Sequence, residues 1–151
     1  MQEIFDPVRK LFVQALPEEK IRQALLRHMV KELKFPISYL SVEIDLKSLP
    51  HLKNKPFPLK RRADIICFAK NKNLFSSLFP LLMIECKSHP LSERVVEQVI
   101  GYNHYVKAHF ICVCNAHEIK TLWYDRKEKK YISVSFLPTY DQLLKTVEGK
   151  I

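Results

Sequence analysis

Two carboxylates and one amine interrupt strand-like apolar runs of the sequence: Asp64, Glu85 and Lys87. The run 81–87 ends on Glu85 and Lys87, and because side chains alternate faces along a strand, this acid and this base point the same way. Asp64 lies inside a second β-prone run, 63–68. Unpaired carboxylates are costly in such apolar surroundings, so a shared cation is expected to neutralise both acids.

The cation that suits these residues is Mg²⁺, with Mn²⁺ as a substitute. Magnesium prefers oxygen ligands and usually takes one or two carboxylates together with waters and substrate phosphate. Asp64 and Glu85 would supply the carboxylates, and the main-chain carbonyl of Cys86 would add a third ligand. The ammonium of Lys87 would orient or help to deprotonate a metal-bound water for attack on phosphorus. These residues therefore predict metal-assisted hydrolysis of a phosphodiester bond.

A structural explanation competes with this one, because a Glu-x-Lys triplet is common on solvated helices and edge strands. Position favours a site: the triplet 85–87 ends an apolar strand and follows an acid in the preceding strand. Two surface charges would not need to converge there. Taken together, Asp64, Glu85 and Lys87 are better explained by a site than by chance.

The composition indicates a globular domain with an anionic partner. The chain has 151 residues, 47% of them hydrophobic, which is enough for one domain, 1–151, with its own core. Lys and Arg number 25 against 16 acids, and the formal net charge of +9 suits nucleic acid or an acidic membrane surface. The N-terminus lacks the pattern of a signal peptide, and no apolar run is long enough to span a membrane. We expect a soluble, cytoplasmic protein without a membrane partner.

A basic loop is the predicted contact for nucleic acid. The segment 48–61 contains three prolines and is, at minimum, a solvated connection. Its bases and the arginine that follows it are the candidate phosphate contacts: Lys53, Lys55, Lys60, Arg61 and Arg62.

Two other kinds of site are excluded. The four cysteines lie in apolar runs without a C-x-x-C pair, and Cys114 with His117 is not completed by a second ligand pair, so a zinc site is not expected. Only two glycines occur, Gly101 and Gly149, so the chain can build neither a P-loop nor a dinucleotide-binding turn. An ATP-driven motor within these 151 residues is therefore excluded.

The elements that must position the site follow from hydrophobic periodicity and turn residues. Residues 1–15 have apolar side chains at near-helical spacing and are expected to form a short packing arm. The remaining chain predicts helices over 17–34, 92–106 and 140–147, and strands over 39–47, 62–69, 81–87, 110–114, 119–124 and 131–136. We expect antiparallel pairing of 62–69 with 81–87, and a parallel partner for 110–114 after a crossover helix. The predicted fold class is α/β, with a mixed central sheet flanked by helices.

The order of these elements and their polar residues resembles the PD-(D/E)XK nuclease superfamily, and specifically the N-terminal nuclease domain of type I restriction enzyme R subunits. The resemblance covers roughly residues 16–140. It is carried by Pro17-Glu18-Glu19-Lys20-Ile21-Arg22-Gln23, Val42-Glu43, Arg62-Ala63-Asp64-Ile65, Glu85-Cys86-Lys87, Gln98-Val99-Ile100-Gly101-Tyr102-Asn103, Asn115 and Leu137-Pro138-Thr139-Tyr140. The combination is far more specific than any one of these motifs.

The resemblance implies a restriction-endonuclease-like core and a set of residues at the reaction centre. Asp64, Glu85 and Lys87 would be the catalytic trio. Gln98 and Tyr102, one helical turn apart, would be accessory residues near the DNA. The first-helix acid at the metal would be Glu19, although an acid in a first turn also has a sufficient reason in the helix dipole.

The preferred interpretation is a stand-alone, Mg²⁺-dependent DNA endonuclease of restriction or repair type, without a helicase motor. One alternative is a catalytically inactive, basic nucleic-acid-binding module on the same fold. Another is a regulatory subunit recruited by a protein partner that supplies a motor. The enzyme is preferred because a binding module would give no reason for a set of five residues to be present, and substitution at any of the first three would have favoured the module: Asp64, Glu85, Lys87, Gln98 and Tyr102.

Overall fold

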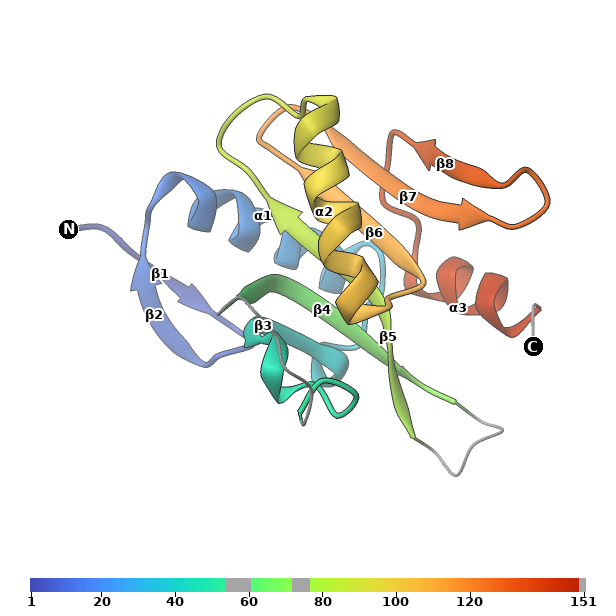
Figure 1. Cartoon of the computed structure of the whole chain (residues 1–151). Coiled ribbons are helices and arrows are strands. Elements are labelled where there is room, and N and C mark those ends of the chain that lie inside the picture. Colours follow the sequence, from blue (N-terminus) through green and yellow to red (C-terminus); the bar gives the residue numbers. More distant parts are fainter. Residues whose placement is uncertain (54–60, 72–76, 150–151) are drawn as a thin grey trace.

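A mixed six-stranded sheet forms the centre of the molecule (Figure 1). The computed structural model describes residues 1–53, 61–71 and 77–149. In spatial order the strands are β3 (Leu40–Asp45), β4 (Arg62–Lys70), β5 (Leu78–Cys86), β6 (Phe110–Cys114), β7 (Ile119–Asp125) and β8 (Lys130–Val134). β5 and β6 run parallel, and the other neighbours pair antiparallel. Both predicted pairings and the α/β fold class are confirmed.

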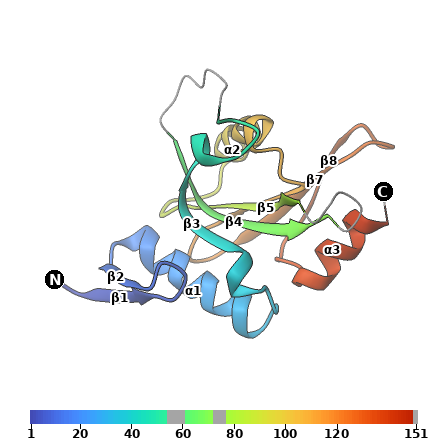
Figure 2. The same ribbon diagram turned by 90° about the horizontal axis from the view of Figure 1, so that it is seen from below.

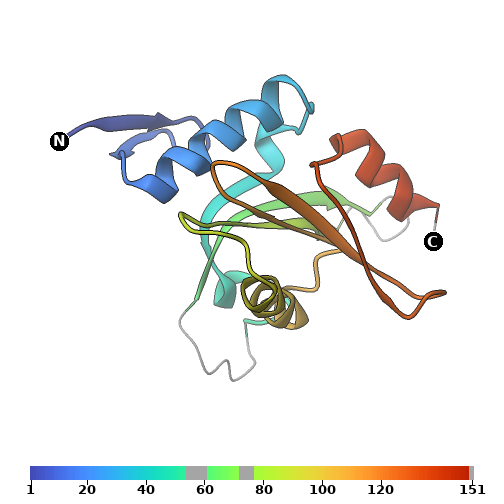
Figure 3. The ribbon, with the colours of Figure 1, turned by 90° about the horizontal axis from the view of Figure 1, so that it is seen from above.

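Helices cover both faces of the sheet. α1 (Pro17–Lys31) and α3 (Tyr140–Glu148) lie on one face and α2 (Glu93–Val106) on the other, as Figures 2 and 3 show from opposite sides. α2 is the predicted crossover between the parallel strands, and the Ser92 hydroxyl caps it by accepting from the Val95 N–H at 3.3 Å. In the described residues, no helix is long and apolar enough to cross a membrane.

The first helix ends three residues earlier than predicted, at Lys31. Lys34 adopts a left-handed conformation with φ 59°, and the Phe35 N–H bonds back to the Met29 carbonyl at 2.9 Å. Two short 3₁₀ turns, Ile37–Tyr39 and Leu46–Ser48, flank β3.

The core has two parts, one on each face of the sheet. Leu26 and Met29 of α1 pack with Ile84 on one face, and Val99 of α2 packs with Met83 on the other. All five residues of β6 are buried, as expected for a strand that is covered on both faces. Burial of apolar side chains therefore holds α1 to one face of the sheet and α2 to the other.

β5 begins at Leu78, not at residue 81, and it includes Pro80. Its pairing with β4 shifts where Cys67 faces Leu82 but Phe68 faces Pro80, so Leu81 is an extra residue in a β-bulge. Leu81 consequently packs on the α1 side together with Leu82, and the predicted alternation is wrong at this residue. From Leu82 to Cys86 the alternation holds, which places Glu85 on the α2 side with Met83.

The N-terminal arm is a β-hairpin, β1 (Glu3–Asp6) and β2 (Leu11–Gln14), beside α1 (Figure 1). The predicted packing arm thus consists of two strands, and the near-helical spacing of its apolar residues does not correspond to a helix. The turn is set by Asp6, whose Oδ1 accepts from the N–H groups of Val8 at 2.8 Å and Arg9 at 2.9 Å, and by Lys10 with φ 56°. Local turn chemistry thus decides the conformation of residues 1–15.

Candidate functional site

Asp64 and Glu85 meet near the end of β5, where β4 lies beside it. Asp64 Oδ2 accepts from the Cys86 N–H at 2.8 Å, so the acid of one strand is fixed to the backbone of the next. Glu85, directly before Cys86, is buried with only 7% of its surface exposed. The structure therefore brings together the two acids that lie 21 positions apart in the sequence.

The buried Glu85 carboxyl has a pKa well above its ordinary value. Burial is the largest cause, followed by the negative charge of Asp64 and a hydrogen bond between the two side chains. The charges of Lys87 and Arg61 oppose the rise without cancelling it. Burial and the neighbouring Asp64 thus disfavour the charged form of Glu85, and a bound cation would offset both effects, so this donor set fits a cation.

Arg22 of α1 joins Asp64 to two further carboxylates, those of Glu43 and Glu19. Its Nη1 donates to Asp64 Oδ1 at 3.0 Å and to Glu43 Oε1 at 2.5 Å, and its Nε donates to Glu19 Oε2 at 2.6 Å. Burial acts to lower the Arg22 pKa, but the hydrogen bonds to Glu19 and Glu43 and the charges of Glu19 and Asp64 outweigh it, and the pKa lies above normal. Arg22 is therefore a permanently charged, buried partner of Asp64.

Both oxygens of Glu19 are occupied by arginines. Oε1 accepts from Arg9 of the hairpin, and Oε2 accepts from Arg22. Burial acts to raise the Glu19 pKa, but these two arginines lower it below its ordinary value. The assignment of Glu19 as a metal ligand remains a prediction, and the contacts show it holding two guanidinium groups in place.

Glu43 reaches Arg22 because the strand alternation breaks at this residue. Its φ of 55° is in the left-handed region, which is uncommon for a residue other than glycine. Val42 packs on the α1 side and Ile44 on the α2 side, so Glu43 does not point where a regular strand would place it.

The sequence reasoning did not place Arg22 or Glu43 at the site. A signal for Arg22 was available: with Leu26 and Met29 it lies on the buried face of α1, where an unpaired cation would be costly. The signal for Glu43 was weaker, since an alternating strand places it with the polar residues.

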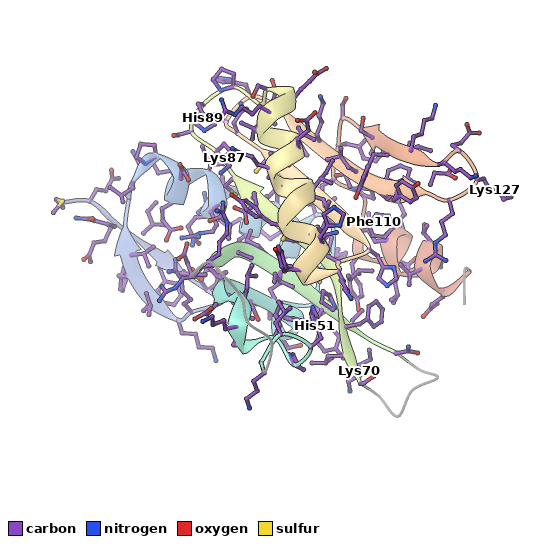
Figure 4. All side chains as sticks on the ribbon, in the orientation of Figure 1. His51, Lys70, Lys87, His89, Phe110 and Lys127 are labelled. Carbon is purple, nitrogen blue, oxygen red and sulfur yellow. The ribbon has the colours of Figure 1, made fainter. Side chains whose placement is uncertain are left out.

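Lys87 follows β5 directly. Its N–H donates to the Cys114 carbonyl at 2.8 Å, which extends the parallel ladder by one bond and fixes the backbone at the site. The side chain is half-buried, and Figure 4 shows it beyond the end of β5 beside α2. Since its charge opposes the raised pKa of Glu85, Lys87 is electrostatically part of the same site.

Tyr102 of α2 is connected to the site through Arg61. The Arg61 guanidinium lies over the Tyr102 ring, 3.2 Å from its centroid, and the Arg61 charge also acts on Glu85. Gln98, one turn earlier, is exposed on α2. Tyr102 is therefore linked to the acids indirectly, because Arg61 contacts the Tyr102 ring and its charge acts on Glu85. Gln98 lies at the surface of the same helix.

The predicted basic residues separate into two groups. Arg61 and Arg62 lie at the start of β4 near the acids, and Arg62 Nη1 is 3.9 Å from Glu43 Oε2. Lys53 is exposed and lies two residues after His51. The His51 ring forms a hydrogen bond with the Tyr105 carbonyl at 2.7 Å, near the C-terminal end of α2, whereas Lys87 lies near the other end of this helix (Figure 4). Lys55 and Lys60 lie outside the described residues.

A cleft of about 630 Å³ opens beside Asp64. The N-terminal hairpin, α1, β3, β4 and the segment after β5 contribute to its walls. The lining residues are Arg9, Val13, Gln14, Leu16, Pro17, Glu18, Glu19, Arg22, Glu43, Asp64 and Ser88. The cleft therefore leaves open space next to Asp64 and Arg22, whereas Glu85 and Lys87 are not among its lining residues.

The oxygen donors suit a hard cation. Within the described ranges, no group of three or more His, Cys, Asp and Glu side chains is arranged to hold a metal ion. Asp64 and Glu85 form a pair. In proteins Mg²⁺ usually binds one or two carboxylates, and water and substrate phosphate complete its ligand set.

The raised pKa of Glu85 gives a prediction about stability. A carboxyl with a folded-state pKa above its unfolded value favours folding below the unfolded pKa, and loses that contribution as the pH rises through the folded pKa. At neutral pH in the absence of divalent ions, Glu85→Gln is therefore expected to raise the unfolding temperature, and the gain should shrink on acidification. Thermal unfolding between pH 4 and pH 8 measures this, with the exposed Glu97→Gln as control. A difference from the wild type that is independent of pH would contradict the prediction.

Comparison with known families confirms the resemblance. The family model for the type I restriction enzyme R protein N terminus matches residues 17–138, which include α1, the whole sheet and α2. Neither a curated protein nor a solved structure matches the chain. The chain therefore belongs to the type I restriction enzyme R protein N-terminal family, whose restriction-type, nuclease-like function implies interaction with DNA.

Proposed function

We propose that this protein is a Mg²⁺-dependent deoxyribonuclease that hydrolyses phosphodiester bonds in DNA, with Mn²⁺ able to replace Mg²⁺. The observation that carries the proposal is the pairing of the buried Glu85 with the half-buried Asp64, on which the positive charge of Lys87 also acts. A bound cation would stabilise two neighbouring carboxylates of this kind, and family membership supports DNA as the substrate.

Asp64, Glu85 and the main-chain carbonyl of Cys86 would hold the ion. The Cys86 N–H donates to Asp64, and in extended backbone the N–H and C=O of one residue face the same edge, so the carbonyl faces Asp64 as well. When bound, the ion would supply Lewis acidity and a water of lowered pKa. Glu19, predicted as a further ligand, accepts from Arg9 and from Arg22, and in this proposal its role is to hold these two guanidinium groups in place.

The remaining residues would orient the reactants. Lys87 would hold the attacking water in line and stabilise negative charge as it develops on phosphate oxygens. Arg61, stacked on Tyr102, and the exposed Arg62 would bind the DNA backbone near the acids, with Gln98 and Lys53 as more distant contacts. The hydrolysis as proposed uses the ion and water and includes no step that consumes ATP.

Cleavage assays test this proposal. Supercoiled, linear and single-stranded DNA are incubated with the purified protein without ATP, in Mg²⁺, Mn²⁺ or EDTA. We expect cleavage with Mg²⁺ and Mn²⁺ and none with EDTA. Asp64→Asn should abolish cleavage, and Asp141→Asn, at an exposed acid of α3, should not. A wild-type protein that binds DNA but cleaves with neither ion would favour the inactive binding module.

A further inference from the structure

A continuous chain of ion pairs leads from the N-terminal hairpin to Asp64. Asp6 Oδ2 accepts from Arg9 Nε at 2.7 Å, and Arg9 Nη2 donates to Glu19. Glu19 in turn accepts from Arg22 Nε at 2.6 Å, and Arg22 Nη1 donates to Asp64 at 3.0 Å. The charges alternate at every step, so each of the three inner residues, Arg9, Glu19 and Arg22, has an opposite charge on either side.

The hairpin end of this chain is firmly anchored. The Asp6 side chain is fully buried, and besides Arg9 Nε it accepts from the N–H groups of Val8 and Arg9 and from Gln23 Nε2 at 3.0 Å. A buried carboxylate with this many donors has little rotational freedom. Asp6 therefore fixes the position of Arg9, and through the bond from Gln23 it ties the hairpin to α1.

The other end of the chain determines how Asp64 is presented. Its oxygens accept from the Cys86 N–H at 2.8 Å and from Arg22 at 3.0 Å, and a further hydrogen bond joins the side chain to Glu85. A carboxylate has about four lone-pair sites, so Asp64 keeps a lone pair for a cation beside these three contacts while the group cannot rotate. Partners of this kind orient metal-binding carboxylates, and their loss typically weakens metal affinity about 10- to 100-fold.

We propose that Arg22 and Arg9 are positioning residues for Asp64, and that the hairpin is thereby a working part of the nuclease site. This inference rests on the proposed function. Glu19 divides its charge between the two arginines, so removal of Arg9 would leave that charge to Arg22 alone and draw the guanidinium away from Asp64. The hairpin precedes the matched residues 17–138, and the match itself therefore does not assign it this role.

The cleft supports the same conclusion. Val13 and Gln14 of the hairpin line it together with Arg9, Asp64 and Ser88. The hairpin thus lies beside the acids in space as well as through the ion pairs, although 50 residues separate Gln14 from Asp64 in the sequence.

Calorimetric titration of Mg²⁺ into the full chain tests the positioning role. Arg22→Lys keeps the charge but loses the planar fork, and we expect about a 10- to 100-fold weaker Mg²⁺ affinity. Arg9→Gln, which alters only the hairpin end, should weaken the Mg²⁺ affinity measurably, by a factor of up to about 10. The matched controls are Arg27→Lys and Arg27→Gln, at an exposed arginine of the same helix, and they should bind as the wild type does. If Arg22→Lys does not fold, Arg9→Gln decides, and wild-type affinity in a folded Arg9→Gln would overturn the inference.

If the wild type binds no Mg²⁺, the proposed function is wrong. The coupling between Arg9 and Asp64 can then still be measured in metal-free protein. The variants Arg9→Gln and Asp64→Asn are combined in a double-mutant cycle, with the urea midpoint as the measurement. If the ion-pair chain couples these residues, the double variant shifts the midpoint by an amount that differs from the sum of the two single shifts. Additive shifts, such as those expected for Arg27→Gln with Asp64→Asn, would overturn the inference.

Discussion

Arg22→Met is expected to lower the free energy of unfolding by about 3–5 kcal/mol. The substitution keeps much of the apolar stem but leaves Glu19, Glu43 and Asp64 without the guanidinium that joins them. Glu19 dominates the expected loss because its side chain is only 8% exposed, whereas that of Glu43 is 32% exposed and partly screened by water. Urea unfolding at neutral pH in EDTA measures the change.

The control for this prediction is Arg27→Met at the exposed arginine of α1, which should change the free energy of unfolding by no more than about 0.5 kcal/mol. The pH dependence provides a second check. The lowered pKa of Glu19 contributes stability above its unfolded pKa, and that contribution is lost as the pH falls through the folded pKa. The difference between Arg22→Met and the wild type should therefore narrow on acidification below about pH 4. A constant difference, or one as small as that of the control, would contradict this account of Arg22.

Lys87→Met is expected to reduce the rate of DNA cleavage by about 10²–10³ while leaving Mg²⁺ and DNA binding intact. Methionine keeps the stem length but removes the ammonium, whose interaction strengthens only as negative charge develops in the transition state. A plasmid-nicking time course with saturating Mg²⁺ resolves a rate change of this size.

Lys127→Met is the matched control, because Figure 4 shows Lys127 at the tip of the β7–β8 hairpin, far from Lys87. It should cleave at the wild-type rate. A Lys87→Met variant that also cleaves at the wild-type rate would remove Lys87 from the mechanism without removing the nuclease. Loss of Mg²⁺ binding in Lys87→Met would instead indicate a structural role.

The predictable part of the fold comes from patterns that are local in the sequence. The apolar runs of β4, β5 and β6, the charged turn between β7 and β8, and the Ser92 cap of α2 each determine an element without reference to distant residues. The same patterns indicated that Asp64, Glu85 and Lys87 would converge, and the structure places them together. Their roles as catalytic residues remain predictions.

The features that escaped the sequence depend on contacts between distant residues or on backbone irregularities. The bulge at Leu81 and the left-handed conformation of Glu43 change the face of the sheet on which side chains lie. Neither leucine nor glutamate is a residue type from which such an irregularity could be predicted. Arg22 meets Asp64 across 42 positions, and only the packing of α1 on the sheet brings them together. Spacing alone therefore could not reveal the ion-pair chain or the role of the hairpin.

The claim that Asp64 and Glu85 share one divalent ion is tested most directly by counting bound ions. Mn²⁺, which replaces Mg²⁺ in this account, can be titrated into metal-free protein and its free fraction read by electron paramagnetic resonance. We expect one ion per wild-type chain, at least about 10-fold weaker binding in both Asp64→Asn and Glu85→Gln, and wild-type binding in Glu97→Gln. Equal Mn²⁺ binding by the wild type, Asp64→Asn and Glu85→Gln would contradict it.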